Sequence, residues 1–191
     1  MKSIGIMGGT YDPIHTGHLI VAQSVLEKRN LDEIIFIPCY ISPHKQDVLS
    51  SSAEHRLEML KLSLDGYNNF EYSDFEIANK GVSFTLNTLI EFNKLYSNIE
   101  LIIGYDNIIS FDKWYQPDKV LEMCKLVVLK RSVDNPPDIQ HKYFEMAEYV
   151  DTPMIEISAT EIRERVKNNL PIDNLVPQNV KEYIYVNGLY K

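Results

Sequence analysis

Two histidines near the N-terminus are the first residues of this chain whose spacing suggests chemistry. His15 and His18 stand three positions apart, after the glycine pair Gly8-Gly9 and the turn-forming Asp12-Pro13. Residues i and i+3 of a helical turn face the same way, so both imidazoles can act on one group. A helix that begins near Gly17 would point its unpaired N–H groups at the same place, and the glycines would let the backbone approach a ligand closely. The arrangement predicts a phosphate site.

The glycine spacing excludes the two common phosphate signatures. Gly5, Gly8 and Gly9 do not follow the G-x-G-x-x-G pattern, and no Gly-Lys-Ser/Thr follows four variable residues as in a P-loop. A zinc site is an alternative interpretation, because His15, His18 and His44 together have the composition of a three-histidine metal centre. Other residues of the chain suit a phosphate better than a divalent cation, namely Thr10, Lys45 and Arg163.

The composition is that of an ordinary soluble globular protein. Of the 191 residues, 45% are hydrophobic and 24% are charged, which sets aside disordered and collagen-like classes and predicts one domain over residues 1–191. We find no apolar stretch of membrane-spanning length and no signal-peptide pattern, so we expect a cytoplasmic protein without a membrane partner. The net charge of −8 disfavours a nucleic-acid partner. Cys39 and Cys124 are expected to be reduced thiols.

Alternating strands and helices must position these residues. We expect strands in the run beginning at Ile4 and over residues 32–38, 70–77, 99–103, 126–129 and 154–157. Helices are expected from near Gly17, from a capping box at residues 51–54, from Ser83 or Thr85 to about Ser97, over 111–115, 117–123 and 143–149, from a second capping box at residues 158–161, and from Pro177 to Val186. This alternation predicts an α/β protein with a doubly wound parallel sheet, which binds its ligand at the carboxyl ends of the strands.

The segment from Gly8 to Leu19, GGTYDPIHTGHL, resembles the H-x-G-H signature of the nucleotidyltransferase superfamily and, in its longer form, that of bacterial nicotinate-nucleotide adenylyltransferases. Further segments are similar to motifs of that family: residues 42–45, 81–85, 104–106, 111–115, 157–163 and 176–190. Ser42 stands where the family has a proline, and Ala159 where it has a second serine. The resemblance covers nearly the whole chain and implies a Rossmann-like nucleotidyltransferase fold with a C-terminal helical segment.

The resemblance also implies an activity, namely transfer of the adenylyl group of ATP to nicotinate mononucleotide, which gives deamido-NAD and pyrophosphate in NAD biosynthesis. Mg²⁺ is expected to bridge the substrate phosphates, with no metal ligand supplied by the protein. The family contains monomers and oligomers, and a homodimer is one expectation. Two alternatives stay open. The acceptor is a different phosphorylated compound, such as nicotinamide mononucleotide or phosphopantetheine, or the chain is a non-catalytic nucleotide-sensing module.

Roles follow residue by residue from the matching motifs. The resemblance implies catalytic roles for His15, His18, Lys45 and Arg163. It implies ATP contacts for Gly8, Gly9, Thr10, His15, His18, Gly104, Asp106, Ser158 and Arg163. It implies mononucleotide contacts for Lys45, Thr85, Asp106, Trp114 and Tyr115. Taken alone, several of these residues have structural alternatives: a solvated lysine for Lys45, a core side chain for Trp114, a helix cap for Asp106 and local ion pairs for Arg163.

Overall fold

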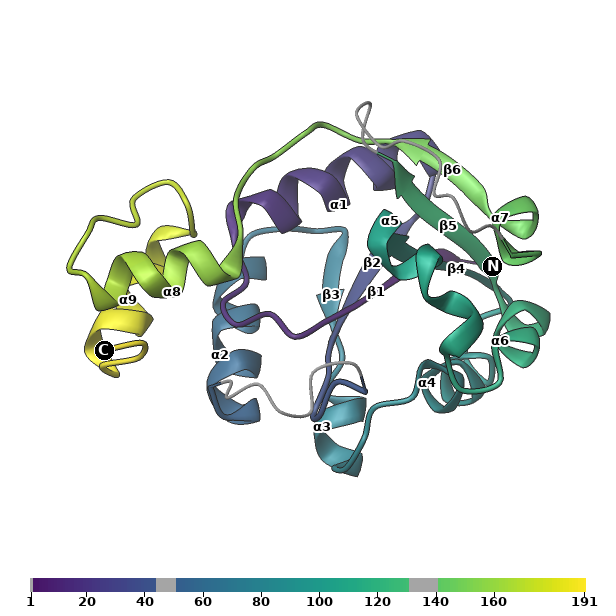
Figure 1. The fold of residues 1–191 in the computed structure, drawn as a ribbon, viewed down its shortest axis with the longest axis horizontal. Helices are drawn as coiled ribbons and strands as arrows, with labels where there is room; N and C mark the ends of the chain where they lie inside the picture. Colours follow the sequence, from purple (N-terminus) through teal and green to yellow (C-terminus); the bar gives the residue numbers. More distant parts are fainter. Residues whose placement is uncertain (1, 44–50, 131–140) are drawn as a thin grey trace.

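The computed structural model describes residues 2–43, 51–130 and 141–191. Its centre is a six-stranded sheet with the order β3-β2-β1-β4-β5-β6, in which every pairing is parallel (Figure 1). The strands are β1 (Ser3–Gly9), β2 (Glu33–Pro38), β3 (Phe70–Tyr72), β4 (Asn98–Gly104), β5 (Lys125–Lys130) and β6 (Glu148–Asp151). The chain moves outward from β1 to β3 and then returns to β4 on the other side of β1. The order therefore reverses between β1 and β4, where such sheets bind ligands.

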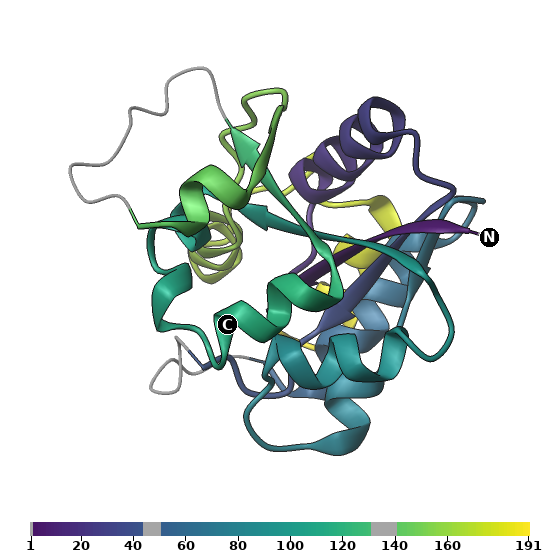
Figure 2. The same cartoon turned by 90° about the vertical axis from the view of Figure 1, so that its right-hand side faces the viewer.

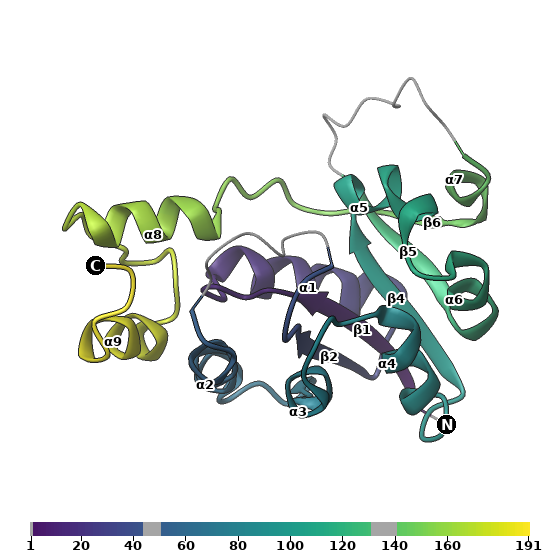
Figure 3. The same cartoon turned by 60° about the horizontal axis from the view of Figure 1, so that its bottom comes forward.

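Helices cover both faces of this sheet. In chain order they are α1 (Thr16–Arg29), α2 (Ala53–Leu64), α3 (Phe75–Asn79), α4 (Thr85–Phe92), α5 (Tyr105–Ile109), the 3₁₀ turn η1 (Phe111–Lys113), α6 (Pro117–Met123), α7 (Tyr143–Met146), α8 (Ala159–Lys167) and α9 (Gln178–Val186). Figure 2 shows the teal and green helices in front of the strands and the yellow C-terminal segment behind them. In Figure 3, α8 and α9 lie at the opposite end of the molecule from α6 and α7.

Alternating strand residues build one hydrophobic layer on each face. In β2, Ile34 and Phe36 enter one layer, while Ile35 and Ile37 enter the other, as expected for side chains that alternate along a strand. The first layer also contains buried residues of α1, α2, α8 and α9. The second contains buried residues of α4, α5, α6 and α7. We call these the first layer and the second layer below.

Most predicted elements are confirmed, but the strand predicted over residues 70–77 is wrong in its second half. β3 ends at Tyr72, and Phe75 begins the short helix α3. The change occurs at Ser73, whose hydroxyl accepts the N–H of Phe75 at 3.2 Å, and the N–H of Ala78 then reaches the carbonyl of Asp74. A local side-chain bond of this type competes with strand pairing and favours a turn.

The last predicted strand is also misplaced. Residues 154–157 form an irregular connection, and the sixth strand is β6, four residues of which pair with β5. The exposed fractions explain why β6 and not the segment 154–157 joins the sheet, because Val150 in β6 is 7% exposed whereas Met154 is 50% exposed. The helix predicted over residues 143–149 is correspondingly short. Smaller corrections are that α4 ends at Phe92 and that the N-cap of α2 is Ser52.

Candidate active site

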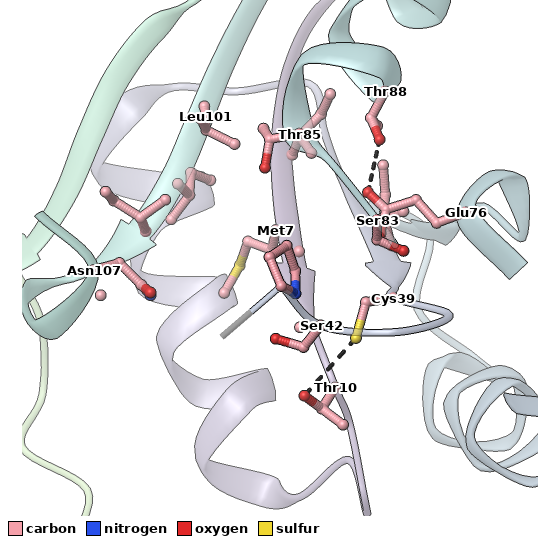
Figure 4. Close-up of a pocket in the computed structure, with 18 of the residues that line it drawn as sticks. Met7, Thr10, Cys39, Ser42, Glu76, Ser83, Thr85, Thr88, Leu101 and Asn107 are labelled. Carbon is pink, nitrogen blue, oxygen red and sulfur yellow. Dashed lines mark hydrogen bonds between the residues drawn. The ribbon is translucent and has the colours of Figure 1, made fainter. Parts of the chain in front are cut away.

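A cavity of about 440 Å³ opens at the carboxyl ends of the central strands. Its walls include Gly8 and Gly9 at the end of β1, Ile37 at the end of β2 and Gly104 at the end of β4. Figure 4 shows Thr10, Ser42, Thr85 and Asn107 around this space, supplied by four different parts of the chain. The cavity therefore lies where the reversal of strand order predicts a ligand.

The two histidines meet at the start of α1. His15 is the N-cap, and its backbone N–H donates to Nδ1 of His18 at 3.2 Å. The imidazole rings stack with centroids 3.6 Å apart, and the edge of the Tyr11 ring approaches His18 with a centroid distance of 5.1 Å. Because Nδ1 of His18 accepts a bond, the proton of its neutral form lies on Nε2. The spacing-based prediction that both rings face the same way is confirmed.

A side chain would be crowded at two glycine positions of this turn. A Cβ on Gly17 would lie 3.1 Å from Nδ1 of His15 and 3.1 Å from Cγ2 of Ile155. A Cβ on Gly9 would lie 2.8 Å from the ring of Tyr11. A side chain on Gly9 would therefore displace the tyrosine ring, and one on Gly17 would require its neighbours to shift by a few tenths of an ångström.

Burial makes both histidines neutral at pH 7. It lowers the pKa of His15 from 6.5 to about 4. It lowers the pKa of His18 to about 3, and the neighbouring His15 contributes to that shift. Nδ1 of His15 is buried without a hydrogen-bond partner in the described part of the chain. The pair therefore offers polar imidazole nitrogens, not positive charges, to a ligand in the apo protein.

Three segments that are distant in sequence converge on Asp12, which is 4% exposed. Arg163 in α8 donates Nη1–H to the carbonyl oxygen of Asp12 at 2.7 Å. The hydroxyl of Tyr190 donates to Oδ1 at 2.7 Å, and the backbone N–H of Ser51 donates to Oδ2 at 3.1 Å. Arg163 also donates to Oγ1 of Thr160. These bonds fix the start of α8 beside the turn that holds the histidines.

A buried arginine joins the same turn to the loop after β2. Arg56 is 1% exposed and donates to the backbone carbonyls of Thr10 at 2.8 Å, Tyr40 at 3.1 Å and Ser51 at 3.2 Å. Within the described ranges, no carboxylate lies at ion-pair distance from it. Three carbonyl dipoles thus compensate this charge, which is expensive to bury without such partners.

The cavity also has an aromatic wall. Trp114 and Tyr115 follow η1 and line the cavity together with Phe84 and Thr85 at the start of α4. Trp114 packs against Phe111 with a centroid distance of 5.0 Å, and Tyr115 lies 4.8 Å from Phe84. Trp114 is half-buried: it packs on the second layer and also lines the cavity, while its contact with a mononucleotide stays a prediction.

Comparison with known proteins agrees with this geometry. A family model described as cytidylyltransferase-like matches residues 6–165. The nicotinate-nucleotide adenylyltransferase of Bacillus subtilis (strain 168) is 40% identical over 196 residues, covering 100% of both chains. A probable nicotinate-nucleotide adenylyltransferase of Methylacidiphilum infernorum is 42% identical, covering 98% of this chain and 91% of the relative. The chain belongs to the nicotinate-nucleotide adenylyltransferases.

The fold of this adenylyltransferase is also that of a solved relative. The Plasmodium falciparum nicotinic acid mononucleotide adenylyltransferase complexed with APC superposes with a TM-score of 0.76 at 20% identity, covering 100% of this chain and 98% of the other. The predicted doubly wound, Rossmann-like sheet is therefore confirmed. None of the helices in the described ranges combines the length and apolarity needed to span a bilayer.

Most residues expected at the site of an adenylyltransferase lie at or beside the cavity. Its lining includes Gly8, Gly9, Thr10, His18, Thr85, Gly104, Trp114 and Tyr115. His15 stacks on His18, and Arg163 reaches the same turn, although neither lines the cavity itself. Ser158 is the N-cap of α8 and accepts the N–H of Glu161 at 3.1 Å, as the capping box predicts. Asp106 is exposed in the first turn of α5, and Lys45 lies outside the described residues.

The two departures from the adenylyltransferase motifs fall at different places. Ser42 lines the cavity, so it replaces a rigid proline with a hydroxyl at the wall. Ala159 is the first residue of α8, where its backbone N–H stays available to an anion even though the serine hydroxyl is absent. Neither departure removes a group that the proposed chemistry below requires.

Sequence reasoning missed a polar cluster in the cavity wall. Thr88 donates to Oε1 of Glu76 at 2.6 Å, Ser83 also hydrogen-bonds that carboxylate, and the N–H of Tyr40 donates to Oγ of Ser83 at 2.9 Å. Burial raises the pKa of Glu76, while the two hydroxyls oppose that shift. The misplaced strand over residues 70–77 concealed this glutamate, because it put residue 76 on a sheet and not on α3.

The two cysteines are not joined by a disulfide. Cys39 and Cys124 are free thiols, as predicted, and Sγ of Cys39 lies 3.8 Å from Oγ1 of Thr10 at the cavity wall. Burial raises the pKa of the Cys39 thiol.

In the ranges that the structure describes, no group of three or more His, Cys, Asp or Glu side chains is arranged to hold a metal ion, while His44 of the alternative zinc site lies outside those ranges.

Proposed function

We propose that this chain transfers the adenylyl group of ATP to nicotinate mononucleotide, forming deamido-NAD and releasing pyrophosphate in NAD biosynthesis. The observation that carries this proposal is one site with two chemically different groups of residues. One is the stacked pair His15 and His18, with Arg163 bonded to the same turn, and the other is the aromatic wall of Trp114 and Tyr115. Phosphates suit the first group, and a flat heterocycle suits the second.

The transfer needs no nucleophile from the protein. A phosphate oxygen of the mononucleotide is already ionised at neutral pH, so it attacks the α-phosphorus of ATP directly, and the bond to the bridging oxygen of pyrophosphate breaks. Catalysis then consists of aligning the two substrates and stabilising the charge that develops on the phosphate oxygens. Neutral His15 and His18 donate N–H bonds to these oxygens, while Gly8, Gly9 and Thr10 shape the turn around them.

Pyrophosphate leaves toward α8. Arg163 has five N–H donors, two of which bind Asp12 and Thr160, so others remain for the leaving group. The first turn of α8, capped by Ser158, adds backbone N–H groups and the positive end of the helix dipole. Lys45 is proposed to neutralise a substrate phosphate in the same reaction, as the motif implies.

Mg²⁺ is proposed to arrive on the phosphates of ATP. The donors proposed for the phosphates are imidazoles, a guanidinium and backbone N–H groups, which bind phosphate oxygens and leave a hard cation to the phosphates and water. When bound, the ion would neutralise charge on the phosphates and hold them in line.

The pyridine ring of the mononucleotide is proposed to stack on Trp114. Its carboxylate would then accept N–H groups at the start of α4, whose first residue is Thr85. Gly104 and Asp106, at the end of β4 and the start of α5, would bind ribose hydroxyls. A cytoplasmic location and a homodimer stay predictions of the sequence.

The test is release of pyrophosphate from ATP and Mg²⁺ with one of three acceptors at equal concentration: nicotinate mononucleotide, nicotinamide mononucleotide or phosphopantetheine. We expect rapid release with nicotinate mononucleotide and at least about 10-fold slower release with the others, because the start of α4 favours an anion. Faster release with another acceptor would reassign the substrate. No release with any acceptor from folded protein would favour the nucleotide-sensing alternative.

A further inference from the structure

Tyr190 and Asp12 are 178 positions apart in the sequence and 2.7 Å apart at their bonded oxygens. The bond places one donor on Oδ1 of Asp12, and the N–H of Ser51 places another on Oδ2. Arg163 is left with the backbone carbonyl of the same residue. In the described ranges, Arg163 thus bonds the backbone of Asp12 and forms no ion pair within 4 Å with its buried carboxylate.

This division of partners has a chemical consequence. A charge-assisted bond between a guanidinium and a carboxylate is about twice as strong as a neutral hydrogen bond, so the carboxylate of Asp12 competes with a substrate phosphate for the donors of Arg163. Each donor on the carboxylate occupies an acceptor site and weakens this competition. The hydroxyl of Tyr190 is one of these donors.

We propose that Tyr190 is a positioning residue for Arg163: by donating to the carboxylate of Asp12, it weakens the attraction of that carboxylate for the guanidinium and leaves the remaining N–H groups of Arg163 to the leaving pyrophosphate. The inference rests on the proposed function, in which Arg163 binds that group. It assigns to the C-terminal tyrosine an effect on ATP and pyrophosphate, and no effect on the mononucleotide.

The backbone of Tyr190 supports a specific role. Its φ of 64° lies in the left-handed region, which is strained for a bulky side chain and persists only where surrounding contacts hold it. The ring hydroxyl also lies 3.9 Å from Sδ of Met59, so it is held between α2 and the turn at Asp12. The chain thus keeps this hydroxyl in place against a local conformational preference.

Tyr183 provides a matched control. Its hydroxyl lies 2.9 Å from Nδ1 of His55, so it joins α9 to α2 just as Tyr190 joins the end of the chain to Asp12. Both tyrosines are half-buried, and each loses one hydroxyl in a Tyr→Phe variant. In the described structure, the hydroxyl of Tyr183 has no hydrogen bond to Asp12 or Arg163. Tyr183→Phe therefore tests a weaker attachment of the C-terminal segment alone. Tyr190→Phe tests in addition the effect on Arg163.

The experiment compares full-length wild type, Tyr190→Phe and Tyr183→Phe. Binding of inorganic pyrophosphate is measured by calorimetry, and the rate of pyrophosphate release is measured while ATP and the mononucleotide are varied separately. We expect Tyr190→Phe to weaken pyrophosphate binding and kcat/KM for ATP by about 10-fold, with an unchanged KM for the mononucleotide. Tyr183→Phe should match wild type in both assays. The melting temperatures of the two variants should fall by similar amounts.

A third variant tests the cause. Asp12→Asn in the Tyr190→Phe background removes the competing charge, so pyrophosphate affinity should recover by several-fold relative to Tyr190→Phe alone. Equal pyrophosphate affinity in Tyr190→Phe and Tyr183→Phe would overturn the proposal. A loss of pyrophosphate affinity that is explained by a smaller fraction of folded protein would also overturn it. The same holds if the affinity does not recover in the double variant. If wild type binds pyrophosphate but releases none with any acceptor, the proposed function fails, and the binding comparison still decides the role of Tyr190.

Discussion

Acidification provides a direct test of the desolvated histidine pair. We consider the apo protein taken from about pH 7.5 to about pH 4.5, and the variant His15→Asn as the comparison. The pKa of His15 is about 4 in the folded protein and close to 6.5 when unfolded. Between these two pH values, His15 is protonated in the unfolded chain and neutral in the folded chain. The stability contributed by neutral His15 is therefore complete above pH 6.5 and is lost as the pH falls toward 4.

The magnitude follows from the two pKa values. Between about pH 7.5 and 4.5, a shift from 6.5 to about 4 corresponds to a loss of about 2–3 kcal/mol of unfolding free energy from His15. His18, with a pKa of about 3, adds a loss of similar size. Together these are a large share of the roughly 5–15 kcal/mol that stabilises a typical domain.

The assay is urea unfolding at several pH values, followed by circular dichroism, for wild type and His15→Asn. Asparagine is a preferred N-cap residue, so the variant keeps α1 capped while it removes one titrating group. Carboxylates elsewhere titrate equally in both proteins and cancel in the difference. The difference in unfolding free energy should change by about 2–3 kcal/mol in favour of the variant across this pH range. A pH-independent difference would refute the claim that His15 is held neutral by burial.

Three further predictions concern single side chains. His18→Ala should lower kcat at least about 100-fold, because it removes a donor to the developing phosphate charge, while circular dichroism stays that of wild type; near-normal turnover would contradict the assignment. Trp114→Ala should raise KM for the mononucleotide about 10-fold and leave KM for ATP unchanged, and an equal rise in both values would show that Trp114 only supports the fold. Arg56→Met should lower the unfolding free energy by about 3 kcal/mol, since it leaves three carbonyls without a donor, whereas a change below about 0.5 kcal/mol would refute that accounting.

The sequence predicts the parts of the fold that depend on local pattern. The histidine turn, the central strands and the capped start of α8 at Ser158 follow from short-range periodicity and capping, and the structure has them where they are expected. The end of β3 depended on one hydroxyl bond at Ser73, and the position of β6 depended on pairing with β5. Periodicity does not report either of these effects, so both edges of the sheet were mispredicted.

The site shows the same division. Several residues predicted from motifs line the cavity, whereas residues brought in by tertiary contacts were not predicted. Glu76 reaches the cavity only because α3 replaces the expected strand, and Tyr190 reaches Asp12 only through the packing of the C-terminal segment. Arg56 lies inside an ordinary amphipathic helix pattern, where nothing local indicates three carbonyl partners.

The two hydrophobic layers carry different halves of the proposed reaction. His15, His18 and Arg163 stand on α1 and α8, which pack into the first layer, whereas Thr85 and Trp114 stand on elements that pack into the second. The sheet separates these layers, so repacking of one layer leaves the other largely undisturbed. A change of acceptor can therefore arise from substitutions behind α4 and η1, while the histidine pair and Arg163 keep their supports.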